Sequence, residues 1–409
     1  MNLDFGTEYD AFRNDVRSFC DRYKGVQVTG SLFQYLEATN INNDDDLKIS
    51  AQEWQKILIE NGYFARHIPK EYGGYGGALD IVKNSIINEE FLKAKIPDGT
   101  GGQGIDFLVP TLLDMGTDEQ KQRYIKPALQ LDEIWCQGYS EPNAGSDLAS
   151  LQTKGVLDGD EWVINGQKIW TSTAKYAQMM FCLVRTEPDA PKHKGISYLL
   201  IPMDTPGIEI RPLVDMTLDA GFNEVFFTDV RIPATNIVGE RGQGWLVANR
   251  TLVHERGSLG DPAKMVSRFN KLVELMKTET IDGHRVIDKP VFRDRLMKIQ
   301  GKVLALKAHG LRLLSARLNK GQEVALATMI VKLYGTEMRY ELESLAIDVM
   351  GELGTLYEES PHLRNGGGWQ YAYMYYLGLI IGGGTSQIQK NIISERGLGM
   401  PKEPKAREG

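Results

Sequence analysis

The sequence predicts an α+β fold, mostly α, with a helical N-terminal domain (1–130), a central antiparallel β domain (131–240) and a C-terminal four-helix bundle (241–409). Three observations predict this order. The 409 residues are enough for two or three packed units. The hydrophobic pattern has a helical period at both ends of the chain and gives way to β-rich runs between them. Proline-bearing turns rather than long helices separate those runs, which favours an antiparallel sheet over a parallel βαβ array.

The first 130 residues read mainly as helices joined by loops such as PKEYGGYGGALD. In GTDEQKQRYIKPAL, Thr117 and Gln120 have the spacing of a capping box and predict the start of a helix. The glycines of GGYGG do not follow a clear strand within a βαβ pattern, so they do not indicate a Rossmann dinucleotide site.

The central part contains short runs rich in β-forming residues. EWVINGQKIWTS reads as two runs joined by Asn165-Gly166, and this dipeptide predicts a two-residue hairpin turn. Further strands are expected in GISYLLIPM, GIEIRPLVD and NEVFFTDVRIP. Beyond residue 242 the helical period returns, with long segments at 292–318 and 327–351 that suggest a bundle.

Composition narrows the function classes. A formal net charge of −7 and the lack of a basic-aromatic stripe argue against binding nucleic acid or an anionic membrane. There is no secretory signal and no apolar run of ~18 residues, so no membrane span is expected. Three cysteines and six histidines without metal-like spacing predict neither a metal site nor a disulfide framework, and they favour the cytoplasm as the location.

Two stretches carry candidate binding groups. WCQGYSEPNAGSDLAS, residues 135–150, offers hydroxyls, an amide and backbone N–H groups to one ligand, or it is simply a well-satisfied turn. KIWTSTAKYA sets Trp170 beside Thr171 and Ser172. This arrangement is either ordinary sheet packing or an aromatic wall, with adjacent hydroxyls, for a planar heterocycle.

Taken in order, six blocks of this chain resemble those of the acyl-CoA dehydrogenase family. They are IPKEYGGYGG, WCQGYSEPNAGSDL, VINGQKIWTS, FNEVFFTDVRIP, GERGQGW and GGGTSQIQKNIISERGLG. The resemblance covers nearly the whole chain. It implies non-covalent FAD, dehydrogenation of an acyl-CoA thioester, electron-transfer flavoprotein as acceptor, and a homotetramer or a heterotetramer with a paralogous subunit.

The resemblance also implies which residues contact the cofactor. Phe292 and Gln300 would serve the flavin of the neighbouring subunit, although Lys289 stands where many members carry an arginine. Ser146 would face both the flavin and the CoA thioester. The other implied cofactor residues are Gln137, Tyr139, Ser140, Trp170, Thr171, Ser172, Thr385 and Gln387.

Many family members place the catalytic glutamate directly before the Gly-Thr of the last block, where this chain has Gly383. A second location is known in the family, on the first helix of the C-terminal domain, and it matches Glu255-Arg256 here. At about 100° per residue, Glu255 falls with Trp245, Ala248, Leu252 and Leu259 within an arc of roughly 80°. A carboxylate in an apolar stripe is paired, neutral or chemically active. The other interpretation is an ordinary Glu-Arg pair at the edge of a helix.

Together with the resemblance, these residues predict a separate role for each group. Glu255 would take the α-proton, the backbone N–H of Gly383 would stabilise the enolate-like thioester oxygen, and Arg256 would bind substrate. In the family arrangement, small residues at 257, 258 and 260 lie opposite the glycines at 382–384, so a branched, alicyclic, steroid side-chain or long acyl group is expected. A non-catalytic or half-site subunit of a heteromeric dehydrogenase and an acyl-CoA oxidase remain alternatives.

Overall fold

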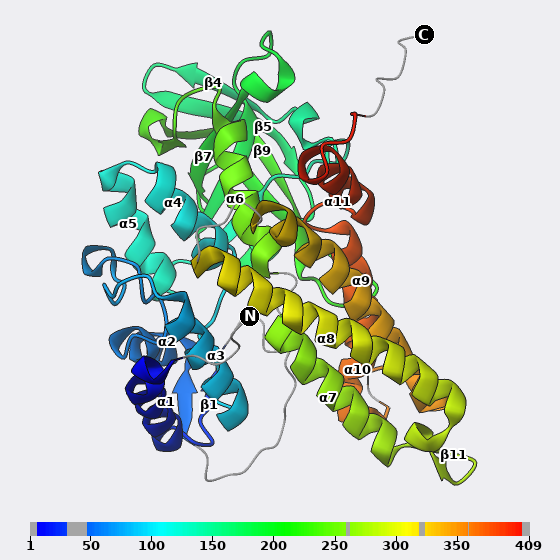
Figure 1. Cartoon of the computed structure of the whole chain (residues 1–409). Helices are drawn as coiled ribbons and strands as arrows, with labels where there is room; N and C mark the ends of the chain where they lie inside the picture. Colours follow the sequence, from blue (N-terminus) through cyan, green and yellow to red (C-terminus); the bar gives the residue numbers. More distant parts are fainter. Residues whose placement is uncertain (1–5, 31–46, 259–261, 319–323, 359, 403–409) are drawn as a thin grey trace.

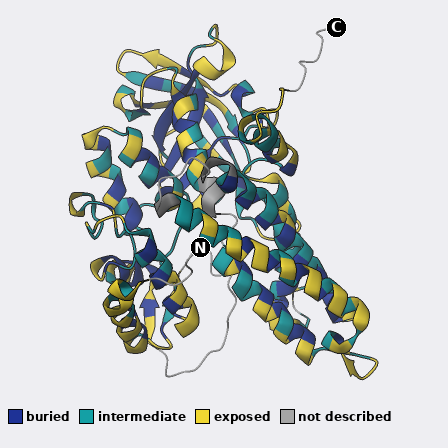
Figure 2. Ribbon diagram, viewed as in Figure 1, coloured by how far each residue is buried: buried dark blue, intermediate teal, exposed yellow. Residues whose placement is uncertain are grey.

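The computed structural model describes residues 6–30, 47–258, 262–318, 324–358 and 360–402, and for 255–258, 317, 318 and 324–326 it describes the backbone only. The predicted fold class is confirmed, because helices, then a sheet, then long helices follow one another along the chain (Figure 1). Figure 2 shows buried residues in the sheet and on the inward faces of the helices around it.

The N-terminal part is built from short helices. The capping box is confirmed at α5, where the Thr117 hydroxyl accepts from the Gln120 N–H and the Gln120 side chain accepts from the Thr117 N–H. The amide of Gln120 also donates to the carbonyl of Ile237 at 2.8 Å and so ties α5 to the sheet. The elements are α1 Asp10–Arg22, β1 Gln27–Thr29, β2 Lys48–Ser50, α2 Ala51–Glu60, α3 Ile81–Ala94, the π-helical turn η4 Gln103–Leu108, α4 Val109–Met115 and α5 Asp118–Leu129.

The central sheet is mostly antiparallel, as predicted, but β3 runs parallel to its neighbour β6. The strand order is β10-β7-β6-β4-β5-β9-β8, with β3 paired to β6 off this path. The strands are β3 Trp135–Gly138, β4 Lys154–Asp158, β5 Glu161–Lys168, β6 Met179–Arg185, β7 Ile196–Pro202, β8 Ile208–Leu213, β9 Phe222–Pro233 and β10 Ile237–Val238.

The predicted hairpin turn at Asn165-Gly166 is wrong. The β4–β5 turn lies one strand earlier, around Gly159, and β5 continues through Asn165 and Gly166. Gly166 is needed there for two other reasons: it has φ 147° at a register shift against β9, and a Cβ would lie 2.7 Å from the Cα of Thr153. A bulge and a close backbone approach therefore use the same dipeptide that usually marks a hairpin.

The C-terminal helices include the long pair predicted from the sequence. α8 spans Pro290–Leu318 and α9 spans Val324–Met350, and both pack around a core that includes Leu342, Leu345 and Trp369. The remaining elements are α6 Gly244–Ser258, α7 Pro262–Thr278, the hairpin strands β11 Thr280–Ile281 and β12 His284–Arg285, α10 Gly368–Ile381 and α11 Ser386–Ile392.

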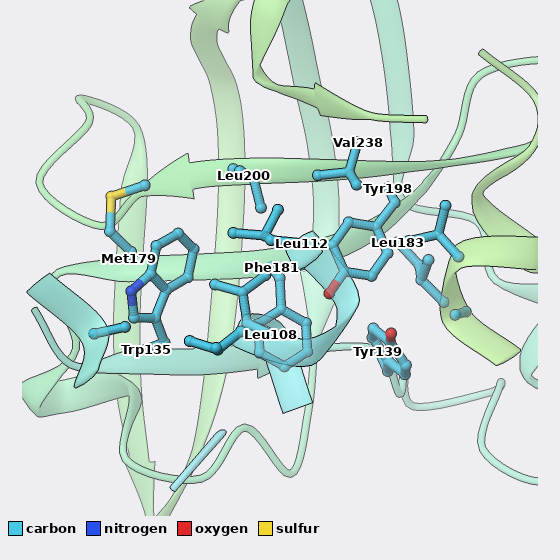
Figure 3. Packing of buried hydrophobic residues seen from close by; sticks show 14 of the residues in the cluster. Leu108, Leu112, Trp135, Tyr139, Met179, Phe181, Leu183, Tyr198, Leu200 and Val238 are labelled. Carbon is cyan, nitrogen blue, oxygen red and sulfur yellow. The ribbon is translucent and has the colours of Figure 1, made fainter. Parts of the chain in front are cut away.

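A single apolar core joins η4 and α4 to the sheet. Leu108 and Leu112 pack with Trp135, Phe181 and Tyr198, and these side chains surround one another in Figure 3. The buried residues Val247 and Ala248 of α6 belong to the same core. Since residues from all three parts of the chain contribute, this core fixes α6 relative to β3 and η4.

Leu108→Ala is expected to destabilise the protein by about 2–5 kcal/mol, because Leu108 is fully buried and its removal leaves a cavity. The measurement is the urea midpoint of unfolding. Leu79→Ala is the matched control, since Leu79 is 70% exposed and should shift stability by less than about 0.5 kcal/mol. Equal midpoints for the two variants would contradict this role of Leu108.

Candidate flavin and thioester site

The strand β3 delivers the residues of the first binding block. A Cβ at Gly138 would lie 2.5 Å from the sulfur of Met180, so only glycine lets β3 approach β6 this closely. The next side chain, Tyr139, turns into the core and packs edge-to-face against Phe181 and Tyr198 at centroid distances of 5.8 and 6.3 Å (Figure 3). The ring of Tyr139 is therefore part of the core that lies behind β3.

A buried ion pair fixes the turn after β3. Lys168 is fully buried, and its ammonium donates to Glu141 at 2.8 Å and to the carbonyl of Tyr139 at 3.1 Å. The Glu141 carboxylate also accepts from the N–H groups of Gln152 and Thr153. Burial raises the pKa of Glu141, but the Lys168 charge and these hydrogen bonds outweigh it, so the pKa of Glu141 is lowered overall.

The second binding block lies beside the first. The Ile169 N–H donates to the carbonyl of Ser140 at 2.9 Å, which places the half-buried Ser140 next to the Trp170 loop. Trp170 has φ 59° and is 59% exposed, with the ring of Phe222 at a centroid distance of 5.9 Å. A left-handed tryptophan is costly for the backbone and points a flat aromatic surface outward.

The loop after Trp170 is held by Asn223. The Thr171 N–H donates to the Asn223 carbonyl at 3.0 Å, and the Asn223 side-chain amide donates back to the Thr171 carbonyl at 2.9 Å. Thr171 is fully buried, yet its hydroxyl has no hydrogen-bond partner among the described residues. A buried hydroxyl without a partner costs free energy, so this atom fits the hydrogen-bonding edge of a bound heterocycle. An exposed ring beside such a hydroxyl suits an isoalloxazine.

Thr171→Val is expected to weaken FAD binding roughly tenfold, because valine keeps the shape and loses the hydroxyl. The same change should leave the apoprotein as stable or more stable, since it removes an unsatisfied buried group. Both quantities are measurable, as the FAD dissociation constant and as the urea midpoint of the apoprotein.

Thr186→Val is the control for that variant. The Thr186 hydroxyl lies 2.7 Å from that of Ser197 in a buried pair, so its loss should lower stability and leave FAD affinity unchanged. The role of Thr171 would be contradicted by unchanged FAD affinity.

The last block forms a glycine turn between α10 and α11. Gly383 and Gly384 have φ of 66° and 89°, in the left-handed region that favours glycine. The carbonyl of Gly383 accepts from the side-chain amide of Gln389 at 3.0 Å, and that of Gly384 accepts from the Lys332 ammonium at 2.6 Å. Within the described part of the chain, the N–H of Gly383 has no acceptor.

Neighbouring residues of this block have structural roles as well. Thr385 caps α11, with its hydroxyl accepting from the Ile388 N–H at 3.1 Å, and Gln387 is exposed. The Ser386 hydroxyl is buried and has no partner among the described residues.

The helix α6 carries the predicted catalytic segment. Ala248 is fully buried, and Trp245 and Leu252 are half-buried against the core, which confirms these members of the predicted apolar stripe. The hydroxyls of Thr251 and Thr111 lie 3.0 Å apart and fasten α6 to α4. The side chains of Glu255 and Arg256, and Leu259 altogether, lie outside the described residues. The α6 backbone places Glu255 one turn beyond Thr251.

Two predicted residues, Phe292 and Gln300, lie apart from this site. Phe292 packs against the core of the bundle and Gln300 is half-buried on the same helix. α8 begins beside the β11–β12 hairpin, at the end of the bundle away from the sheet (Figure 1). Ser146 is exposed in the turn after β3, where the ion pair of Asp147 with Lys192 at 2.8 Å holds the chain.

Two residues that sequence reasoning missed, Lys168 and Lys332, are lysines with no exposed surface. A lone lysine within the apolar run ATMIVKLYG was the available signal for Lys332. Among the described residues, no group of three His, Cys, Asp or Glu side chains is placed to hold a metal ion. No helix in the described ranges is both long and apolar enough to cross a membrane.

Comparison with known proteins gives the same family for all three parts of the chain. Profiles of the acyl-CoA dehydrogenase N-terminal, middle and C-terminal domains match residues 7–132, 136–230 and 242–398. One relative is the acyl-CoA dehydrogenase IpdE1 of Mycolicibacterium smegmatis, 39% identical over 86% of this chain and 88% of that protein.

Two solved structures share this fold over nearly the whole chain. The Tcur3481-Tcur3483 steroid ACAD has a TM-score of 0.78 and 28% identity, with 98% of this chain and 100% of that chain covered. The ChsE4-ChsE5 complex from Mycobacterium tuberculosis has a TM-score of 0.78 and 31% identity, with the same coverage of 98% and 100%.

The three domain matches and these relatives define the class of the protein as a flavoprotein oxidoreductase. This chain belongs to the acyl-CoA dehydrogenase family, and it is an FAD-dependent enzyme of that family.

Proposed function

We propose that this protein oxidises an acyl-CoA thioester to the trans-2-enoyl-CoA, with Glu255 as the base. The observation that carries the proposal is the Gly382–Gly384 turn. Residue 383 has no side chain, and its N–H has no acceptor among the described residues, so this turn can stabilise an anion but cannot accept a proton. The base therefore comes from another element, and Glu255 on the α6 apolar stripe meets that need.

The chemistry divides between the chain and its cofactor. FAD, when bound, supplies the acceptor for the hydride that leaves the β-carbon. Glu255 takes the α-proton as the C–H bond breaks, and the two electrons of that bond form the new double bond. The Gly383 N–H donates to the thioester oxygen, where negative charge develops, and this hydrogen bond is stronger in a site from which water is excluded.

The residues around Trp170 orient the cofactor. The indole would cover one side of the flavin, and Thr171, Ser172 and the 137–140 backbone would satisfy its polar edge. Thr385, which caps α11, and Gln387 in α11 would also contact the cofactor. Arg256 and Ser146 bind the thioester part of the substrate. Each of these contacts is part of the proposal, and the unpartnered Thr171 hydroxyl supports it most directly.

We further propose a ring-bearing, branched or long acyl group as substrate. On the side of the proposed acyl site formed by the end of α10 and the glycine turn, small residues leave open space. A Cβ at Gly378 would meet nothing within 4 Å, and one at Gly382 would meet only the carbonyl of Gly378 at 3.4 Å. Residues 257, 258 and 260 are expected on the opposite side of the acyl group. The structure describes no side chain at these positions. A similar solved structure is titled a steroid ACAD, which favours an alicyclic or steroid side-chain substrate.

The test is a panel of acyl-CoA thioesters with straight, branched, alicyclic and steroid side-chain acyl groups, scored by anaerobic bleaching of bound FAD. Rapid bleaching by the bulky members supports the proposal. Bleaching only by short straight chains would overturn the substrate class, and no bleaching by any thioester would overturn the reaction. Subsequent addition of electron-transfer flavoprotein or oxygen distinguishes a dehydrogenase from an acyl-CoA oxidase.

A half-site subunit of a heteromeric dehydrogenase is the second candidate. Lys289, at the position of the family arginine, is bound to Asp282 of the β11–β12 hairpin at 3.1 Å, so it is engaged within its own chain. Phe292 and Gln300 are proposed to contact the flavin of a neighbouring subunit. They would then lack the additional contact from residue 289. FAD content per chain decides: one FAD per chain supports a homotetramer with full sites, and about half supports a heterotetramer with a paralogous subunit.

A further inference from the structure

The glycine turn that carries the proposed thioester contact is difficult to hold in one conformation. Three consecutive glycines lose more conformational entropy on ordering than any other tripeptide, and no side chain of their own holds them in place. A hydrogen-bond donor for a transition state must nevertheless stay within about 0.5 Å of its productive position. The turn therefore needs restraint from outside.

Two side chains supply that restraint, and both are fully buried. Lys332 comes from α9, and its ammonium donates to the carbonyl of Gly384 at 2.6 Å and to that of Ile380 at 3.4 Å. It thus joins the last turn of α10 to the residue just before the α11 cap. Gln389 comes from α11, and its amide donates to the carbonyl of Gly383 at 3.0 Å.

These contacts fix the peptide planes on both sides of Gly384. On the other side of the turn, the Gly382 N–H donates to the carbonyl of Gly378 at 2.8 Å, as a continuation of α10. The peptide that carries the Gly383 N–H lies between these anchored ends. Its carbonyl neighbours are engaged on the protein side, while the Gly383 N–H has no acceptor within the described residues.

The burial of Lys332 argues that this contact is more than packing. An ammonium without exposed surface is costly to remove from water, and α9 is otherwise strongly apolar around it, in the run ATMIVKLYG. An apolar residue of the same length would fill the space and contribute more stability. A cation next to two backbone carbonyls is suited to orienting those carbonyls.

We propose that Lys332 and Gln389 are positioning residues, which hold the Gly382–Gly384 turn so that its Gly383 N–H is preorganised for the thioester oxygen. This inference rests on the proposed dehydrogenation and adds the device that makes its oxyanion contact rigid. Neither side chain touches the reacting atoms, and both act through the backbone of the turn.

The experiment compares Lys332→Met and Gln389→Met with the intact FAD enzyme. Each variant should lose roughly 10- to 100-fold in kcat with less than about threefold change in KM, because a displaced oxyanion donor costs transition-state rather than ground-state binding. The double variant should lose little more than the worse single variant, since both residues hold the same turn.

A second readout reports the acidity of a bound thioester without turnover. A 3-thiaacyl-CoA, which ionises at its α-carbon but cannot be oxidised, is titrated with pH while the flavin–enolate charge-transfer band is followed. In both variants the apparent pKa of the bound thioester should rise by about one unit or more, because the enolate loses stabilisation. A merely structural role would change stability and leave this pKa where it is.

Lys298→Met is the matched control, since Lys298 is 68% exposed on α8 and pairs with Asp294. It should leave kcat and the thioester pKa unchanged. If Lys332→Met does not retain FAD, Gln389→Met alone tests the inference, because that variant removes only the hydrogen bond to the Gly383 carbonyl.

Wild-type kcat and an unchanged thioester pKa in a folded, FAD-loaded Gln389→Met variant would overturn the inference, as would losses confined to KM. Failure of the proposed function would be seen separately, as a wild-type protein whose bound FAD is not bleached by any acyl-CoA thioester.

Discussion

Glu255→Gln is expected to abolish bleaching of bound FAD by substrate while leaving FAD and thioester binding intact. Glutamine has the shape of glutamate but cannot accept the α-proton, and general-base catalysis contributes about 10²- to 10⁴-fold. The reductive half-reaction should slow by at least that factor, while KM changes little. Anaerobic stopped-flow absorbance of the flavin measures the rate directly.

The large expected effect on the rate of FAD bleaching follows from the position of Glu255 on α6. It lies one helical turn beyond Thr251, which is fully buried and fastened to Thr111 of α4. The α6 backbone is therefore fastened to α4 one turn before Glu255.

Glu274→Gln is the control for Glu255→Gln, because Glu274 is 68% exposed on α7 and pairs only with Lys277 in the described structure. It should bleach at the wild-type rate. Full-rate bleaching in Glu255→Gln would remove Glu255 from the mechanism and direct the search for the base to other elements around the glycine turn.

Lys168→Met is expected to cause a large loss of stability. It leaves the Glu141 carboxylate in a largely buried site without its cation, and breaking a buried pair costs about 3–5 kcal/mol. The same change frees the Tyr139 carbonyl, so the turn that leads to Ser140 loses its anchor. FAD content should therefore fall together with the urea midpoint.

The pH dependence follows from the lowered pKa of Glu141. A carboxyl whose pKa is lower in the folded than in the unfolded state adds stability above the unfolded value of about 4.3, and this stability is lost as the pH falls through the folded pKa. The wild-type protein should lose that contribution on acidification below about pH 4. In Lys168→Met it should be reduced or absent already at neutral pH.

The double variant Lys168→Met with Glu141→Gln tests the pair itself. Removing both charges should recover much of the stability lost in Lys168→Met, since no unpaired charge then remains buried. If the double variant were no more stable than the single one, the cost would come from packing and not from the ion pair.

The sequence allowed the order of domains and the long helices to be predicted because both depend on local patterns. The capping box at Thr117 and the helix containing 327–351 involve residues close in the chain, and the structure has them where expected. The hairpin at Asn165-Gly166 was wrong because a tertiary contact with Thr153 and a bulge against β9 override the local turn preference.

The candidate site was predictable as a set of segments and not as a set of contacts. Family blocks pointed to Trp170 and to the last glycines. They could not show that Tyr139 turns its ring into the core, or that Asn223 holds the Thr171 loop from β9. Lys168 was missed because nothing local distinguishes it from a solvated lysine, and for Lys332 the apolar run ATMIVKLYG was the one local signal. Their partners, Glu141 and the Gly384 carbonyl, are distant in sequence.

In the proposed site, the backbone of the glycine turn also limits which of its residues can change. Gly383 and Gly384 are confined to glycine by their left-handed conformation, but Gly382 has φ −63° and ψ 151°, which every amino acid adopts readily. One residue of the three can therefore acquire a methyl, an isopropyl or a phenyl group without backbone strain. A lineage of such enzymes could narrow or widen its range of acyl groups by exchanging this single residue, while the chemistry stays untouched.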